Sequence, residues 1–241
     1  MKTFKLTAFC AIFMLLTVAC TSKSTPTSND AGAGAAKQLE LPSTNVTKLI
    51  IDNTNGRIEI VGKKDTDKIQ ADLRLNGGDA KDAKLNLTAG KDGVATLEAA
   101  FGGKFLSTGS TSVDVKLTLP EKIPVEIKKT HRDGDINISQ LASGVSIENV
   151  NGQITLSSIG GLIGITNRDG DINIQNAGAD VIIENVNGDI KVANVAGSAN
   201  IQVGDGTLDI DKVNKDVAIL QTGSGQVTVG AVKGKVTRGK K

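Results

Sequence analysis

Apolar residues recur in the second half of the chain in short groups, in which one polar residue separates two aliphatic ones. Examples are Ile136-Asn137-Ile138, Val145-Ser146-Ile147 and Ile154-Thr155-Leu156, which begin at a constant interval. A third apolar residue follows each pair and is expected to pack inward at the corner, as Leu141, Val150, Ile159 and, further on, Val186. A period of two predicts half-buried β-strands, whereas a helix would require a period of 3.6. The outward strand positions are then Asn137, Thr155, Asn173, Ile182, Lys191, Asn200, Asp209, Ala218 and Thr228.

A glycine preceded by Asp or Asn occurs between these strands at intervals of 18 residues, which is once in every two strands. Asx-Gly pairs accept a positive φ, so each unit is expected to turn sharply at the same place. A related pair, Ser224-Gly225, follows one position later than this period predicts. The predicted structural turn ladder consists of Asp133, Gly134, Asn151, Gly152, Asp169, Gly170, Asn187, Gly188, Asp205 and Gly206.

Two architectures are compatible with strands and Asx-Gly turns: a meander of hairpins and a stack of coils. Longer repeats favour the stack, because residues 130–138 recur as 166–174 and residues 145–152 recur as 181–188. Antiparallel neighbours would not bring the same side chain to the same offset repeatedly, whereas stacked coils do. We therefore predict an all-β fold, a parallel single-stranded β-helix or β-solenoid with 18-residue coils.

The segment before these repeats follows the same scheme with an insertion. Residues 51–60 resemble a coil, but the interval from Gly56 to Gly134 is not a whole number of coils. The intervening residues alternate with period two at 69–75, 85–87, 94–97 and 113–119. We expect antiparallel strands that lie against or cap the first coils. At the other end, Lys233, Lys235, Arg238, Lys240 and Lys241 would discourage end-to-end stacking.

The first residues have the pattern of an export signal. Lys2 and Lys5 precede an apolar run from Leu6 to Ala19 that is too short to span a bilayer. The segment Leu16–Cys20 resembles a bacterial lipoprotein signal, which implies lipidation at Cys20 and, with Thr21 after it, an outer membrane location where the cell has one. An ordinary cleavable signal is the alternative. We predict a signal peptide at 1–19, a flexible tether at 20–44, a first coil with the insert at 45–125 and solenoid repeats at 126–239.

Composition limits the chemistry that such a solenoid can perform. Two Cys and one His leave almost no ligands for zinc or iron–sulfur sites, and aromatic residues make up only 2% of the chain. Loss of Lys2 and Lys5 with the signal leaves 26 basic residues against 26 acidic ones. A neutral chain argues against nucleic acid as a partner, and no motif predicts a cofactor. The basic tail at Arg238–Lys241 is interpreted as a guard of the end.

The order of these features resembles that of a known family. A lipoprotein signal, the sequence NTNGRIEIVG at 53–62, VDVKLTLPEKIPVEI at 113–127 and repeated GDINI and NGDIKV units resemble the bacterial DUF4097 family. Its members are β-strand-repeat, adhesin-like proteins related to the DUF2807 head domains. The resemblance covers residues 45–236 and implies a β-helix on the cell envelope. It implies no catalytic residues.

Few residues are candidates for a catalytic or metal site. Asp133, Asp135, Asp169 and Asp171 could hold a cation between coils, but we interpret them as turn caps because neighbouring coils carry Asn or Gln at the equivalent places. His131 corresponds to Asn167 one repeat later, which favours a polar corner residue over a catalytic base. No nucleophile motif accompanies them.

These observations favour a lipid-anchored, non-catalytic envelope protein, an adhesin-like or scaffold module with a protein or glycan surface as partner. One alternative is a carbohydrate-active β-helix enzyme similar to polysaccharide lyases, because such enzymes share the architecture. Another is a periplasm-facing partner in assembly or sensing. The side of the outer membrane stays open.

Overall fold

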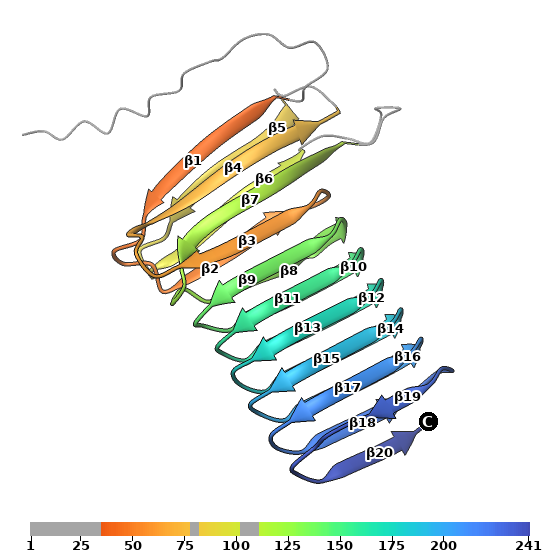
Figure 1. The fold of residues 1–241 in the computed structure, drawn as a ribbon. Helices are drawn as coiled ribbons and strands as arrows, with labels where there is room; N and C mark the ends of the chain where they lie inside the picture. The colour runs from red at the N-terminus through yellow and green to blue at the C-terminus, as the bar shows by residue number, and fades with distance from the viewer. Residues whose placement is uncertain (1–34, 78–81, 102–110) are drawn as a thin grey trace, which may run out of the picture. The chain divides into compact units, whose positions relative to one another are not determined.

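The computed structural model describes residues 35–77, 82–101 and 111–241. These residues form two ten-stranded β-sheets that face each other, with aliphatic side chains between them (Figure 1). The predicted signal peptide, Cys20 and residues 20–34 of the predicted tether lie outside the described residues.

The two sheets are named sheet A and sheet B. Sheet A has the order β1 (Ala36–Pro42), β4 (Lys68–Asn76), β7 (Ser112–Pro120), β3 (Ile58–Lys63), β9 (Ile136–Leu141), β11 (Ile154–Ile159), β13 (Ile172–Ala177), β15 (Ile190–Val195), β17 (Leu208–Val213) and β19 (Val227–Val229). Sheet B has the order β20 (Val236–Lys240), β18 (Val217–Gln221), β16 (Ala199–Asp205), β14 (Val181–Asn187), β12 (Ile163–Asp169), β10 (Val145–Asn151), β8 (Val125–Asp133), β2 (Lys48–Asn53), β6 (Val94–Phe101) and β5 (Ala83–Ala89).

From β8 onwards the chain alternates between the sheets, and each strand pairs in parallel with the strand two places further on. Ile154 lies between Ile136 and Ile172, and Ile163 lies between Val145 and Val181, so the register repeats exactly once per coil. This parallel register confirms the predicted β-solenoid and rules out the hairpin meander, whose neighbouring strands would be antiparallel.

Stacked rows of Ile, Val and Leu fill the space between the sheets. Ile136, Ile154, Ile172 and Ile190, one above another in sheet A, are at most 1% exposed. The sequence pattern placed the third inward residue of the sheet B strands wrongly. Val186 is 54% exposed, and the neighbouring Asn185 points into the core instead. Strict alternation continues through the strand, so the side chain two places after Ile183 is the one that faces inward.

The insert builds one end of both sheets. β6 and β7 pair in parallel with β2 and β3, and they form a coil beyond the one with which the solenoid sequence starts. β4 and β5 pair antiparallel with β7 and β6. The sequence prediction of antiparallel strands therefore holds for β4 and β5 but is wrong for β6 and β7, whose contacts with the first coil are parallel.

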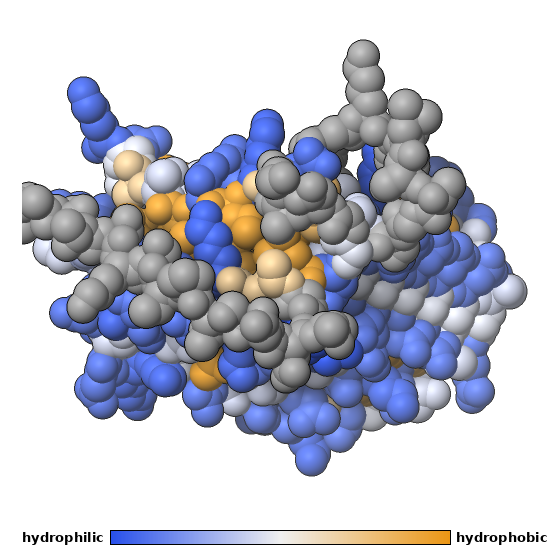
Figure 2. All heavy atoms as spheres, turned by 90° about the horizontal axis from the view of Figure 1, so that it is seen from above, coloured by the Kyte–Doolittle hydropathy of each residue, from blue (hydrophilic) through white to orange (hydrophobic). Residues whose placement is uncertain are grey.

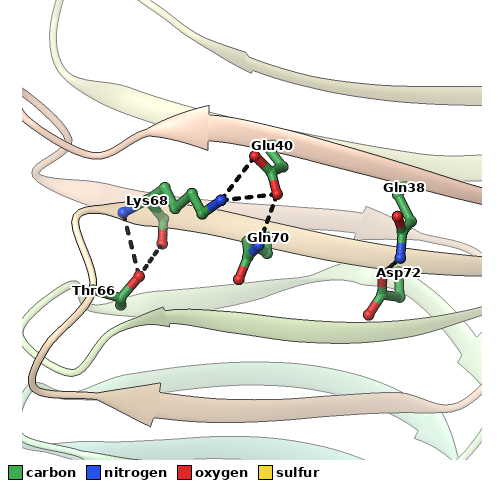
Figure 3. A network of polar contacts seen from close by, with 6 residues as sticks. All are labelled: Gln38, Glu40, Thr66, Lys68, Gln70 and Asp72. Atoms are coloured by element: carbon green, nitrogen blue, oxygen red, sulfur yellow. Dashed lines mark hydrogen bonds and ion pairs between the residues drawn. The ribbon is translucent and has the colours of Figure 1, made fainter. Parts of the chain in front are cut away.

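An edge strand that the sequence prediction missed completes sheet A. The predicted tether included residues 36–42, but these form β1, antiparallel to β4, with Leu39 and Leu41 packed against the core. On the outer face, Lys68 Nζ donates to both Glu40 carboxylate oxygens at 3.0 Å, and Gln70 Nε2 donates at 2.7 Å (Figure 3). Two apolar side chains and this polar network are enough to order a segment that is otherwise small and polar.

Apolar residues show between polar ones when this end is viewed along the stack (Figure 2). The edge strands β1 and β5 contact each other across the two sheets and partly close the end. Leu39, Leu41, Ala83, Leu87 and Phe101 are the half-buried apolar residues that these outermost strands and β6 pack against the core. The antiparallel strands therefore limit exposure of the core at this end of the solenoid.

Candidate functional site

A groove of about 680 Å³ runs along one corner of the solenoid, where sheet A strands end. It begins at the turn after β3 and continues past the corners that follow β9, β11 and β13. Its lining residues are Gly62, Lys63, Lys64, Asp65, Glu121, Gln140, Leu141, Ala142, Ser158, Ile159, Gly160, Asn176 and Gly178.

A row of residues in the left-handed conformation shapes this corner. Gln140, Ser158, Asn176, Asn194 and Lys212 have φ between 56° and 59° and recur once per coil. Such a conformation costs a non-glycine residue about 1 kcal/mol, and the coil accepts it five times because the bend returns the next strand to sheet B. Polar side chains therefore project from the corner at one-coil intervals.

Small residues two positions further on form the floor of the groove. Gly160 N donates to Leu141 O, and Gly178 N donates to Ile159 O, both at 2.7 Å. A Cβ on Gly160 would lie 2.6 Å from the carbonyl oxygen of Ala142, so the coils approach too closely for a larger side chain. The floor is therefore exposed backbone, and the rim is made of side chains.

The rim carries both charges and neutral hydrogen-bonding groups. Lys63, Lys64 and Asp65 come from one turn. Glu121 lies beside this turn, because its N–H donates to Lys63 O at 3.0 Å and its carbonyl oxygen accepts from Ala142 N at 2.8 Å. Ammonium, carboxylate, amide and hydroxyl groups together can donate to and accept from a polar ligand along its length. This combination suits binding of an extended polar chain.

The outer face of sheet A continues this polar surface. A shallower depression of about 260 Å³ lies over β3, β9 and β11 and is lined by Arg57, Glu59, Asn137, Ser139, Thr155 and Ser157 among others. Ser139 and Ser157 directly precede Gln140 and Ser158 of the groove. The structure places all nine sequence-predicted outward positions away from the core, but on two faces. Asn137, Thr155, Asn173, Lys191, Asp209 and Thr228 lie on the outer face of sheet A beside the groove, whereas Ile182, Asn200 and Ala218 lie on the outer face of sheet B.

The opposite corner holds the predicted turn ladder. Gly134, Gly152, Gly170, Gly188 and Gly206 have φ between 119° and 141°. A Cβ on Gly152 would lie 2.2 Å from the carbonyl oxygen of Gly134, so close stacking as well as the positive φ requires glycine.

Aspartates beside this ladder accept hydrogen bonds from the next coil. Asp135 accepts from the backbone N–H of Gln153 at 3.1 Å, and Asp171 accepts from that of Asp189 at 2.9 Å. Asp169 accepts from Asn187 Nδ2 at 2.6 Å and from Arg168 Nε at 2.7 Å. The Asn187 bond, followed by Arg168, holds the pKa of Asp169 below its ordinary value. These carboxylates therefore link neighbouring coils by hydrogen bonds.

The structure does not bring the candidate aspartates together around one ion. Asp133 and Asp169 belong to strands two coils apart, which is about 9.6 Å at ordinary strand spacing. The carboxylate of Asp169 already accepts from Asn187 and Arg168 instead of facing Asp133. Among the described residues, no group of three or more His, Cys, Asp or Glu could hold a metal ion.

A buried polar row lies just inside the turn ladder. It consists of Asn53, His131, Asn149, Asn167 and Asn185, all at most 6% exposed. Asn149 Nδ2 donates to Asn167 Oδ1 at 3.1 Å, and Asn167 Nδ2 donates to Asn185 Oδ1 at 3.0 Å. Asn185 Nδ2 also donates to the carbonyl oxygens of Gly170 and Asn187. The side-chain amides of this row therefore hydrogen-bond to one another and also to backbone carbonyls at the turns.

His131 takes the place of one asparagine in this row. Its Nδ1 lies 3.1 Å from Asn53 Oδ1 and 3.3 Å from Asn53 O, and its Nε2 lies 3.4 Å from Gly134 O. Because both contacts of Nδ1 are shorter, we assign the proton of the neutral ring to Nδ1. Burial lowers the pKa of His131, and hydrogen bonds to Gly134 and Asn53 only partly oppose this. Asn149 Oδ1, next in register, has no hydrogen-bond partner. A fully buried, neutral ring that bridges two coils fits a structural role.

Two of these features had weak signals in the sequence. The left-handed corner row contains Asn176 and Asn194, a residue type that tolerates positive φ. Its other members, Gln140, Ser158 and Lys212, are residue types that do not indicate a left-handed conformation. The buried asparagines recur once per coil, yet an adjacent valine at 150 and 186 drew the inward assignment. Among the described residues, no helix is long and apolar enough to cross a membrane.

Comparisons with known proteins find similarity only among solved structures. No protein-family model matches the sequence. No curated protein matches it either. A "putative adhesin" from Bacteroides fragilis is 16% identical, with 86% of this chain and 97% of that chain covered and a TM-score of 0.44. A "putative cell adhesion protein" from Clostridium sporogenes is 14% identical, with 86% and 99% covered and a TM-score of 0.36. At these values the neighbours identify no site in this chain.

Proposed function

We propose that this chain is a non-catalytic binding module of the bacterial cell envelope, adhesin-like and anchored by lipid at Cys20. The corner groove, with the polar outer face of sheet A beside it, is the observation that carries the proposal. Its groups recur at one-coil intervals, so a partner with an extended polar surface can make many weak contacts in register.

The fold supports rigid presentation of this surface. Parallel register from β8 to β20 and the aliphatic rows between the sheets fix the corner residues in position before any partner arrives. Preorganisation lowers the entropy lost on binding, so shallow polar contacts can suffice. The resemblance of residues 45–236 to the DUF4097 family agrees with this function.

The groove is tested by exchanging charge at its rim. Labelled full-length protein is applied to arrays of glycans and extracellular proteins, and each ligand found is titrated against Lys63→Glu/Lys64→Glu. The matched control is Lys84→Glu/Lys91→Glu, which makes the same change at exposed positions outside the groove. We expect the rim variant to lose about tenfold in affinity and the control to stay within about twofold. No ligand on either array, or equal loss in both variants, would contradict the proposal.

The anchor and the non-catalytic character have separate tests. Cys20→Ser should abolish labelling with a radioactive fatty acid and release the protein from the membrane fraction. Antibody labelling of residues 134–236 on unpermeabilised cells distinguishes surface display from a periplasm-facing role. Depolymerisation of an acidic polysaccharide that depends on Asp133 or Asp169 would show a lyase-like enzyme instead.

A further inference from the structure

The inward rows of sheet B end in charged residues at β20. In register, Val236 follows Val217, Arg238 follows Ile219 and Lys240 follows Gln221. Val217 and Ile219 are at most 5% exposed, whereas all five residues of β20 are exposed. Arg238 therefore stands at a position that the preceding coil fills with the buried Ile219, and Lys240 continues a row that has already turned polar at Gln221.

The cations of this coil lack acidic neighbours in sequence. Residues 222–241 contain Lys233, Lys235, Arg238, Lys240 and Lys241 but no Asp or Glu. None of them takes part in an ion pair found among the described residues. Asp205, Asp211 and Asp216 of the preceding coil accept from the backbone N–H groups of Ser224, Ala231 and Lys235, and not from the side chains of the cations. The terminal coil carries five cations and no acidic residue of its own, so it is a positive face on a chain whose total charge is nearly balanced.

The same face also offers unpaired backbone. β20 is the outermost strand of sheet B and β19 is the outermost strand of sheet A (Figure 1). Within the described ranges no strand pairs with their outer edges, so N–H and C=O groups there are not used in the sheets. A ligand that carries both anionic groups and hydroxyls could satisfy the cations and these backbone groups together.

We propose that the terminal coil, residues 227–241, is a docking face for an acidic polysaccharide. Carboxylates of such a chain would pair with Arg238 and Lys240, which project from one side of β20 about 7 Å apart. Sugar hydroxyls would donate to the exposed carbonyls at intervals along the strand edge. Nucleic acid is disfavoured, because no aromatic residue follows Phe105 in the sequence and single-stranded bases would find no stacking partner.

The experiment titrates full-length protein in detergent with polygalacturonate, and with dextran as the neutral control. We expect binding of polygalacturonate alone, weakened at least about tenfold when the salt rises from about 50 to about 500 mM. Arg238→Gln/Lys240→Gln/Lys241→Gln should lose at least about tenfold in affinity, and Arg238→Lys/Lys240→Arg should retain it. Circular dichroism checks that each variant has the β-structure of the parent.

A matched pair of neutralised lysines outside both the groove and the terminal coil provides the control. Lys84→Gln/Lys91→Gln should bind polygalacturonate within about twofold of the parent. Any ligand found for the groove is titrated separately against the terminal-coil variant, so failure here and failure of the proposed function give different results. Absence of polygalacturonate binding would overturn the proposal. So would equal loss in the control variant, or tighter binding to phosphatidylglycerol vesicles than to the polysaccharide.

Discussion

Replacement of Asn167 by valine tests whether the buried polar row holds the coils together. Asn167 accepts from Asn149 and donates to Asn185, so its loss leaves Asn149 Nδ2 and Asn185 Oδ1 without their partners in the row. Each buried polar group left unpaired costs about 1–3 kcal/mol. Burial of the valine methyls returns about 1–2 kcal/mol. We expect a net loss of about 3 kcal/mol.

The end of the row provides the comparison. Val203 pairs in register with Asn185 and is buried, so a valine side chain fits at this position of a coil. Asn185→Val breaks one bond within the row and three to turn carbonyls, of which Gly170 O keeps Asn167 Nδ2 at 3.3 Å and Asn187 O keeps Gly170 N at 3.0 Å. We expect about 1 kcal/mol for this variant and at most about 0.5 kcal/mol for Asn173→Val on the outer face. Urea unfolding followed by circular dichroism measures all three. Equal losses at 167 and 185, or a stable Asn167→Val, would refute the reasoning.

Three further predictions concern the turns and the titrating groups. Gly152→Ala should lose about 2 kcal/mol or more in urea unfolding, because its φ is +123° and a Cβ would strike Gly134 O, whereas Gly164→Ala, with open space around it, should be near neutral. The pKa of His131 is lowered in the folded protein, so the unfolded chain takes up the proton at a higher pH than the folded one does. The free energy of unfolding should therefore fall as the pH drops below 6.5. His131→Asn should abolish this decline when urea midpoints are compared at about pH 7.5 and about pH 5. The pKa of Asp189 is lowered chiefly by the backbone N–H of Thr207, so its stabilisation is present above pH 3.8 and lost below it, and Asp189→Asn should flatten the acid limb of a pH-unfolding curve.

The sequence predicted the structure best where a residue type or a spacing is compatible with only one local conformation. Period-two alternation and the coil-length repeat predicted parallel stacked strands, because only stacked coils return equivalent side chains to equivalent places. Gly134 and Gly152 marked turns because few other residues accept such φ values at so close an approach.

Prediction failed where position depends on partners distant in sequence. Nothing local shows that Leu39 and Leu41 would find the edge of β4, so β1 was taken for tether. The corner groove depends on the approach of the turn after β3 to the corners from Gln140 onwards, which no single-chain pattern encodes. Inward asparagines were missed because a valine stood next to each at 150 and 186, and hydrophobicity outweighed strict alternation.

The order in which the coils connect affects how the chain can fold. β2 and β3 each pair on both sides with strands that come later in the sequence, β6 and β7 on one side and β8 and β9 on the other. A chain emerging from its N-terminus during synthesis or export therefore cannot complete its founding layer until β9, which ends at Leu141, is free. Every later coil pairs only with the coil before it and the coil after it. Folding beyond Leu141 can therefore proceed coil by coil, from a nucleus that forms late, towards the C-terminus.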